Sequence, residues 1–174
     1  MTVVAAAGND AEDACDTSPA NVSAVITTGA SDPSDSAAWF SNWGPCVDLF
    51  APGTDVLSAA HTSTAGVVAH DGTSMAAPHV TGAAARYLSA VPAAKPSQVH
   101  SVLVVGALDG AVAVPAGTAT PTRLLNLPGR TPVAIDVAVS ETEVSPGGIV
   151  TITGHLRNDA SGTAIPGSIR TVTR

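Results

Sequence analysis

The sequence has 174 residues, of which 45% are hydrophobic and only 3% aromatic, and its formal net charge at pH 7 is −7. This length suits one domain and part of a second, with a core built from Ala, Val and Leu rather than from aromatic rings. Because the chain is acidic and has no cluster of basic residues, nucleic acid is not expected among its partners. No apolar run approaches the roughly 18 residues that cross a bilayer, so no transmembrane segment is predicted.

The first predicted element is a buried strand over residues 2–7, a short and continuous apolar run. The run ends at Gly8, Asn9 and Asp10, which are residues that favour a turn. Parallel sheets carry their functional groups beyond the carboxyl ends of the strands. We therefore expect functional side chains just after this strand.

The next predicted elements are three strands followed by two helices. Apolar and β-branched runs predict strands, and Ala-rich or periodic runs predict helices. The predicted strands cover residues 22–28, 55–60 and 67–69, and the predicted helices cover residues 73–88 and about 96–105. Small side chains in the first of these helices, including Gly82, are expected to let it approach a sheet closely.

A serine lies at the predicted start of the first helix, in the run G-T-S-M-A-A-P-H-V-T-G from Gly72 to Gly82. The start of a helix presents unpaired backbone N–H groups and the positive end of the peptide dipoles, which stabilise an oxyanion. We therefore predict that Ser74 is a nucleophile. The alternative is an Ala-rich core helix with an N-capping serine.

This run resembles the active-serine signature of subtilisin-like serine proteases, which have Gly-Thr-Ser-Met-Ala followed by Pro-His and Gly at the positions seen here. The esterase elbow Gly-x-Ser-x-Gly is disfavoured, because alanine stands two residues after the serine. The resemblance covers roughly residues 2–127. It implies the C-terminal half of a three-layer α/β catalytic domain with a mostly parallel sheet, in which residues 123–126 form the last strand.

The resemblance also implies roles for the first strand and its loop. Asn9 matches the asparagine of the oxyanion hole, whose amide joins the backbone N–H of Ser74, although by itself Asn9 could equally be a turn residue. Ala5, Ala6, Ala7 and Gly8 match part of the pocket for the residue that precedes the scissile bond. The implied reaction is hydrolysis of a protein or peptide through an acyl-enzyme on Ser74, without an organic cofactor.

The family's catalytic aspartate and histidine precede the serine in the chain, and residues 1–60 contain no histidine. His70 and Asp71 are interpreted as loop residues, and His79 as a packed structural histidine. The chain is therefore expected to be a fragment that is inactive alone, with the missing N-terminal half of the catalytic domain as a possible partner. The alternative is an inactive protease remnant that acts as a secreted wall-binding or matrix-binding module.

Cys15 and Cys46 are the two cysteines of the chain. They could be free thiols, but their surroundings resemble the aqualysin-like members of the proteinase K branch, in which cysteines at these places are bridged. The resemblance thus implies a disulfide, which belongs to an oxidising and extracellular setting.

The same branch binds a structural calcium ion through an aspartate that matches Asp48, with two carbonyl oxygens that match Ser23 and Val25. A carboxylate buried between apolar neighbours is costly without a partner, so a cation or several N–H donors must meet it. We expect calcium at this position.

A change of composition after residue 128 predicts a second region. Residues 133–139 alternate between apolar and polar, residues 145–148 favour a turn, and residues 149–156 form another apolar run. This all-β pattern resembles the start of an immunoglobulin-like sandwich but is too short for seven strands. We therefore divide the chain into a peptidase part, 1–128, and a linker with a truncated β domain, 129–174.

Overall fold

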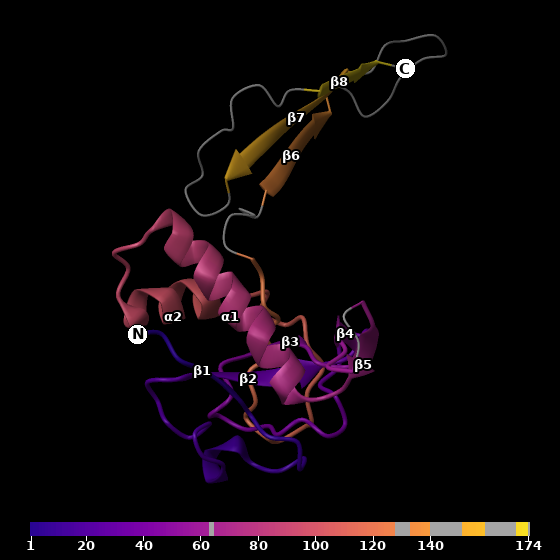
Figure 1. The fold of residues 1–174 in the computed structure, drawn as a ribbon. Helices are drawn as coiled ribbons and strands as arrows, with labels where there is room; N and C mark the ends of the chain where they lie inside the picture. Colours follow the sequence, from indigo (N-terminus) through magenta and orange to yellow (C-terminus); the bar gives the residue numbers. More distant parts are fainter. Residues whose placement is uncertain (63–64, 128–132, 140–150, 159–169, 174) are drawn as a thin grey trace. The chain divides into compact units, whose positions relative to one another are not determined.

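The computed structural model describes residues 1–62, 65–127, 133–139, 151–158 and 170–173 (Figure 1). The chain divides into two compact units, Met1–Pro128 and Gly129–Arg174. Among the described residues, no helix combines the length and the apolar character that a membrane span requires.

The centre of the first unit is a three-stranded parallel sheet in the order β1 (Val4–Ala6), β2 (Ile26–Ser31) and β3 (Leu49–Pro52). Every residue of β2 is buried, as expected for a strand with a neighbour on each side and cover on both faces. β1 forms one edge of the sheet. The strand predicted over residues 2–7 is therefore present, as the shorter β1. Because the three strands are parallel, their carboxyl ends lie at the same end of the sheet.

Two helices cover one face of this sheet (Figure 1). α1 (Thr73–Ala90) contacts all three strands, and α2 (Pro96–Val105) packs against α1. Small buried side chains of α1 meet the branched side chains of the sheet and of α2 in one core cluster, which includes Ala76, Val80, Ala83, Ile26, Leu49, Val99 and Leu103. The predicted α/β fold is thus confirmed, with helix boundaries within two residues of those expected.

The opposite face of the sheet is covered by a short 3-10 helix, η1 (Ala14–Asp16), and by irregular segments. A second apolar cluster forms there around the fully buried side chain of Phe50, with Ala14, Val47 and Val112. This cover holds the loop that follows β1 against the body of the unit.

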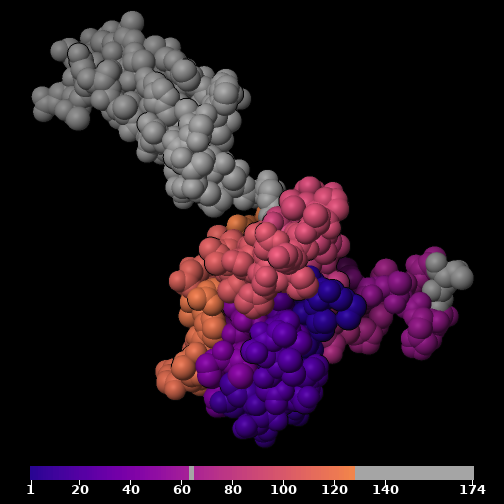
Figure 2. Space-filling view, turned by 90° about the vertical axis from the view of Figure 1, so that its left-hand side faces the viewer, coloured from indigo at the N-terminus to yellow at the C-terminus, as the bar shows by residue number. Residues whose placement is uncertain are grey.

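A hairpin connects the sheet to α1. Its strands are β4 (Val56–Ala59) and β5 (Val67–His70), which lie close to the predicted ranges and pair antiparallel. Figure 2 shows this hairpin standing out from the rest of the unit. Leu57 and Val67 are each 71% exposed, so the hairpin carries apolar side chains that the described part of the chain leaves uncovered.

Three local predictions were wrong. β2 begins at Ile26 rather than at residue 22, because Val22 and Val25 use their N–H groups in turns with Pro19 and Val22 carbonyls. Residues 123–126 run beside β3 but form isolated bridges rather than a strand, since Leu124 bridges Phe50 and Leu108. Gly82 does not pack against the sheet, since a Cβ atom there would have no neighbour within 4 Å.

The described part of the second unit is an antiparallel sheet of β6 (Val133–Val139), β7 (Thr151–Asn158) and β8 (Arg170–Thr173). The strand predicted over residues 133–139 is confirmed, and the one predicted over residues 149–156 is observed two residues later. The turn predicted over residues 145–148 lies outside the described residues. The immunoglobulin-like character of this unit stays a prediction.

Candidate active site

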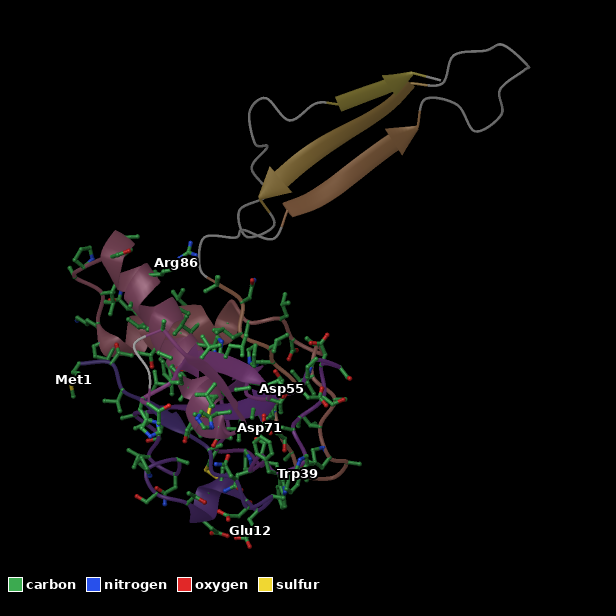
Figure 3. The ribbon with its side chains drawn as sticks, turned by 45° about the vertical axis from the view of Figure 1, so that its right-hand side comes forward. Met1, Glu12, Trp39, Asp55, Asp71 and Arg86 are labelled. Carbon is green, nitrogen blue, oxygen red and sulfur yellow. A yellow bond between two sulfur atoms is a disulfide. The ribbon has the colours of Figure 1, made fainter. Side chains whose placement is uncertain are left out.

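Ser74 is the second residue of α1 and is exposed. The helix starts abruptly because Gly72, which caps it, has φ +147°, a conformation that residues with a Cβ atom rarely adopt. The N–H of Gly72 donates to the carbonyl of Gly53 just after β3. This bond holds the start of α1 at the carboxyl end of the sheet. In Figure 3, Asp71 marks this end of the helix, and Arg86 lies toward the other end.

Asn9 lies beside the first turn of α1, although it is far from Ser74 in the sequence. Its side-chain oxygen accepts hydrogen bonds from the backbone N–H of Thr73 (2.9 Å) and from the Thr73 hydroxyl (2.8 Å). With the oxygen held in this way, the amide nitrogen is the group left for a ligand. Neither this nitrogen nor the hydroxyl of Ser74 has a hydrogen-bond partner within the part of the chain that the structure describes.

Thr73 connects the two predicted site residues, and the sequence analysis assigned it no role. Its hydroxyl donates to Asn9 and accepts a hydrogen bond from the N–H of Gly8 (3.2 Å). The side chain is fully buried. A hydroxyl residue between a helix-capping glycine and a nucleophile was the only available signal in the sequence.

Replacing Thr73 with valine is expected to lower the free energy of unfolding by about 1–2 kcal/mol, because valine keeps the shape but removes both hydroxyl hydrogen bonds. Serine at this position retains the hydroxyl and should recover most of the loss. Urea unfolding of the two variants and the parent chain measures the difference. A valine variant as stable as the parent would contradict the assigned role of the hydroxyl.

A pocket of about 280 Å³ opens beside Ser74, between the hairpin and α1. It is lined by Val56, Leu57, Ser58, Ser74, Met75, Pro78 and His79. Apolar side chains from both elements thus border the nucleophile on the side of the hairpin.

The residues predicted to line a substrate pocket, Ala5 to Gly8, do not line the pocket between the hairpin and α1. Ala5 and Ala7 are buried, whereas Ala6 and Gly8 are half-buried. Of the four, only Ala6 and Gly8 therefore offer accessible surface at the end of β1. Their substrate-binding role stays a prediction.

His79 is not the packed residue that we predicted. It is exposed and lines the same pocket as Ser74, because Pro78 and His79 face the open side of α1. Its Nδ1 lies 2.8 Å from the carbonyl oxygen of Met75. Asp71 has the predicted loop role, since its carboxylate accepts a hydrogen bond from the N–H of Asp55 (2.7 Å).

The environment of Asp48 differs from the expectation. Its side chain is 26% exposed rather than buried. One carboxylate oxygen accepts a hydrogen bond from the N–H of Thr27 (2.8 Å), and the other lies 3.3 Å from Nε2 of His100. The expected calcium carbonyls, of Ser23 and Val25, precede β2 rather than belonging to it. In the described residues, no three His, Cys, Asp or Glu side chains converge to hold a metal ion.

The predicted disulfide is confirmed. Cys15 and Cys46 are bonded, with their Cα atoms 5.2 Å apart. The bond joins η1 to the segment that leads into β3. It therefore ties the loop after β1 to the body of the unit.

An exposed serine at the start of a helix, with an amide held near it at the end of a parallel strand, is the arrangement that hydrolases with a serine nucleophile use. The chain belongs to the subtilase family, whose family model, Peptidase_S8, matches residues 1–131.

Similar proteins point the same way. The chain is 53% identical over 128 residues to the extracellular serine proteinase of Thermus sp. (strain Rt41A). The matched region covers 74% of this chain and 31% of that protein. It is 45% identical over 112 residues to the alkaline serine exoprotease A of Vibrio alginolyticus, covering 64% of this chain and 21% of that one.

A similar solved structure is that of a cold adapted subtilisin-like serine proteinase. Its TM-score is 0.65 at 45% identity, over 70% of this chain and 43% of the other. The fold is thus subtilisin-like, and the chain spans less than half the length of each of these proteins.

Proposed function

We propose that Ser74 is the nucleophile of a serine endopeptidase and that this chain carries the nucleophile and the oxyanion donors of its catalytic domain. One observation carries the proposal: the pair of hydrogen bonds from Thr73 to the Asn9 side-chain oxygen, which keeps the Asn9 amide beside the first turn of α1. The serine proteinases to which the chain is similar support the same reaction.

In this reaction, the oxygen of Ser74 attacks the carbonyl carbon of the scissile peptide bond, and a general base takes its proton. The negative charge that develops on the carbonyl oxygen is stabilised by the Asn9 amide and the Ser74 N–H. The amine leaves with a proton from the same base, which produces an acyl-enzyme on Ser74. Water then releases the acyl group in a second attack, and the serine regains its proton.

The base and its orienting carboxylate are proposed to come from sequence outside these 174 residues, as the order of the triad in the family implies. Without a base, Ser74 keeps its proton and is a weak nucleophile. Two surfaces suit a contribution from the missing half of the domain: β1, which is an edge strand, and the open face of α1 around Pro78 and Gly82. An uncovered apolar edge strand promotes pairing or aggregation.

A chimera tests this proposal. The part of the Thermus proteinase that precedes the region similar to this chain is joined to it, and the product is treated with a fluorophosphonate probe and a peptide ester. We expect labelling and turnover by the chimera, no measurable turnover by the 174-residue chain alone, and complete loss of labelling in Ser74→Ala. Ser89→Ala, on the exposed side of the same helix, should behave like the parent.

A folded chimera that is neither labelled nor active would overturn the endopeptidase proposal and favour the inactive secreted remnant. Labelling of the isolated chain at the rate of the chimera would instead overturn the requirement for an external base.

The protein is proposed to act outside the cell. This location is supported by the Cys15–Cys46 disulfide, since such bonds persist in oxidising compartments, and by the extracellular Thermus relative.

A structural calcium ion at Asp48, with the carbonyl oxygens of Ser23 and Val25, stays a proposal. Carboxylate and carbonyl oxygens are the ligands that calcium prefers. An ion at this position would replace His100 as the partner of one Asp48 oxygen.

A further inference from the structure

Asn42 is a buried polar residue that the reaction described above does not use. Its side chain is 1% exposed and makes four hydrogen bonds. The side-chain oxygen accepts from the N–H groups of Asp10 (2.9 Å) and Glu12 (3.1 Å). The side-chain nitrogen donates to the carbonyl of Ala7 and the hydroxyl of Thr17, both at 3.1 Å. These four bonds use the full capacity of one amide group.

The partners of Asn42 lie on both sides of Asn9. Ala7 directly follows β1, and Asp10 lies on the other side of Asn9. The backbone N–H of Asn42 also donates to the carbonyl of Gly8 (2.9 Å). Asn42 thus holds the main chain before and after Asn9, whereas Thr73 holds the Asn9 side chain.

Asn42 is in turn hydrogen-bonded, through Ser41, to the central strand β2. Its backbone carbonyl accepts a hydrogen bond from the hydroxyl of Ser41, which in turn accepts one from the N–H of Ala30 in β2. Gly8 must be a glycine for this packing, because a Cβ atom there would lie 2.3 Å from the side-chain nitrogen of Asn42. Hydrogen bonds thus connect β2, through Ser41 and Asn42, to the loop that carries Asn9.

We propose that Asn42 is a positioning residue for the oxyanion donor. By fixing the backbone on both sides of Asn9, it sets where the Asn9 amide lies relative to Ser74. Its catalytic consequence rests on the proposed function, but the positioning itself does not. Asn42 touches no reacting atom and acts only through Asn9.

Amide hydrogen exchange on the 174-residue chain tests the positioning without requiring activity. In Asn42→Ala, exchange at Asp10 and Glu12 should speed up at least about tenfold, and the side-chain NH₂ resonances of Asn9 should shift. Asn42→Asp retains the two accepted bonds and loses the two donated ones, so it serves if alanine prevents folding. It should leave Asp10 and Glu12 protected but shift Asn9. Unchanged Asn9 resonances in both variants would overturn the proposal.

A double-mutant cycle in the chimera tests the catalytic consequence. Asn42→Ala alone should slow labelling of Ser74 by about 10- to 100-fold, but by less than about twofold when Asn9 is already alanine. A merely structural role would slow both backgrounds equally, and that result would overturn the proposal. Trp43→Phe is the control. It removes the bond from Trp43 to Ala11 in the same loop and should slow labelling by less than about threefold.

An inactive parent chimera would count against the proposed function alone. The exchange experiment would still decide whether Asn42 positions Asn9.

Discussion

Asn9→Asp in the chimera is expected to reduce the acylation rate of Ser74 by about 100- to 1,000-fold, a size known for the oxyanion-hole asparagine of subtilisin itself and carried over to this relative. Aspartate keeps an oxygen for the two hydrogen bonds from Thr73, so the local structure should persist. It lacks the NH₂ group that donates to the oxyanion. The variant therefore keeps the structural contacts of the side-chain oxygen, removes the donor and places a negative charge near the oxyanion.

Because this donor acts on charge that develops in the transition state, kcat should fall while KM changes little. Steady-state hydrolysis of a peptide ester measures both constants. Asn9→Ala provides the comparison, since it removes the donor and the acceptor together and should lose at least as much rate. If kcat/KM fell only because KM rose, or if kcat stayed within about threefold of the parent, Asn9 would not serve the oxyanion.

Removing the disulfide by replacing Cys15 and Cys46 with serine is expected to lower the free energy of unfolding by roughly 3–4 kcal/mol. The bond joins residues that are 31 positions apart in the sequence, so its loss restores considerable freedom to the unfolded chain. Urea denaturation of the 174-residue chain measures the change. For a unit of this size, such a loss is a large share of the total stability.

Reducing agent provides the matched control for this variant. The parent chain should lose the same stability when the disulfide is reduced, whereas the double-serine variant should not respond. Equal unfolding midpoints for parent and variant under oxidising conditions would show that the bond contributes nothing measurable.

Local chemistry explains which parts of the site could be predicted. The start of α1 depends on Gly72 and on the helix-forming alanines that follow, all within a few residues of Ser74. The run over residues 2–7 predicted β1 because continuous apolar residues suit a strand that is covered on both faces. Both features are properties of short segments, so they could be derived before any contact was known.

Other predictions were wrong because hydrogen-bond partners decided them. Asp48 was expected to be buried, but its side chain is 26% exposed and its oxygens meet Thr27 and His100, while calcium at this position stays a proposal. The segment before Ile26 is β-branched, yet its N–H groups bond within turns. A pattern of side chains does not reveal where the backbone hydrogen bonds of a segment go.

The sequence by itself determined the family and the positions of both helices, and it predicted the nucleophile and the disulfide, because each depends on neighbouring residues or on a long specific motif. Only the tertiary structure decided how Asn9 is oriented. Its side chain is held by Thr73, which is 64 positions away in the sequence. Its backbone is held by Asn42, which is about 30 positions away. These contacts exist only after α1 and the loop before β3 have packed against the end of β1.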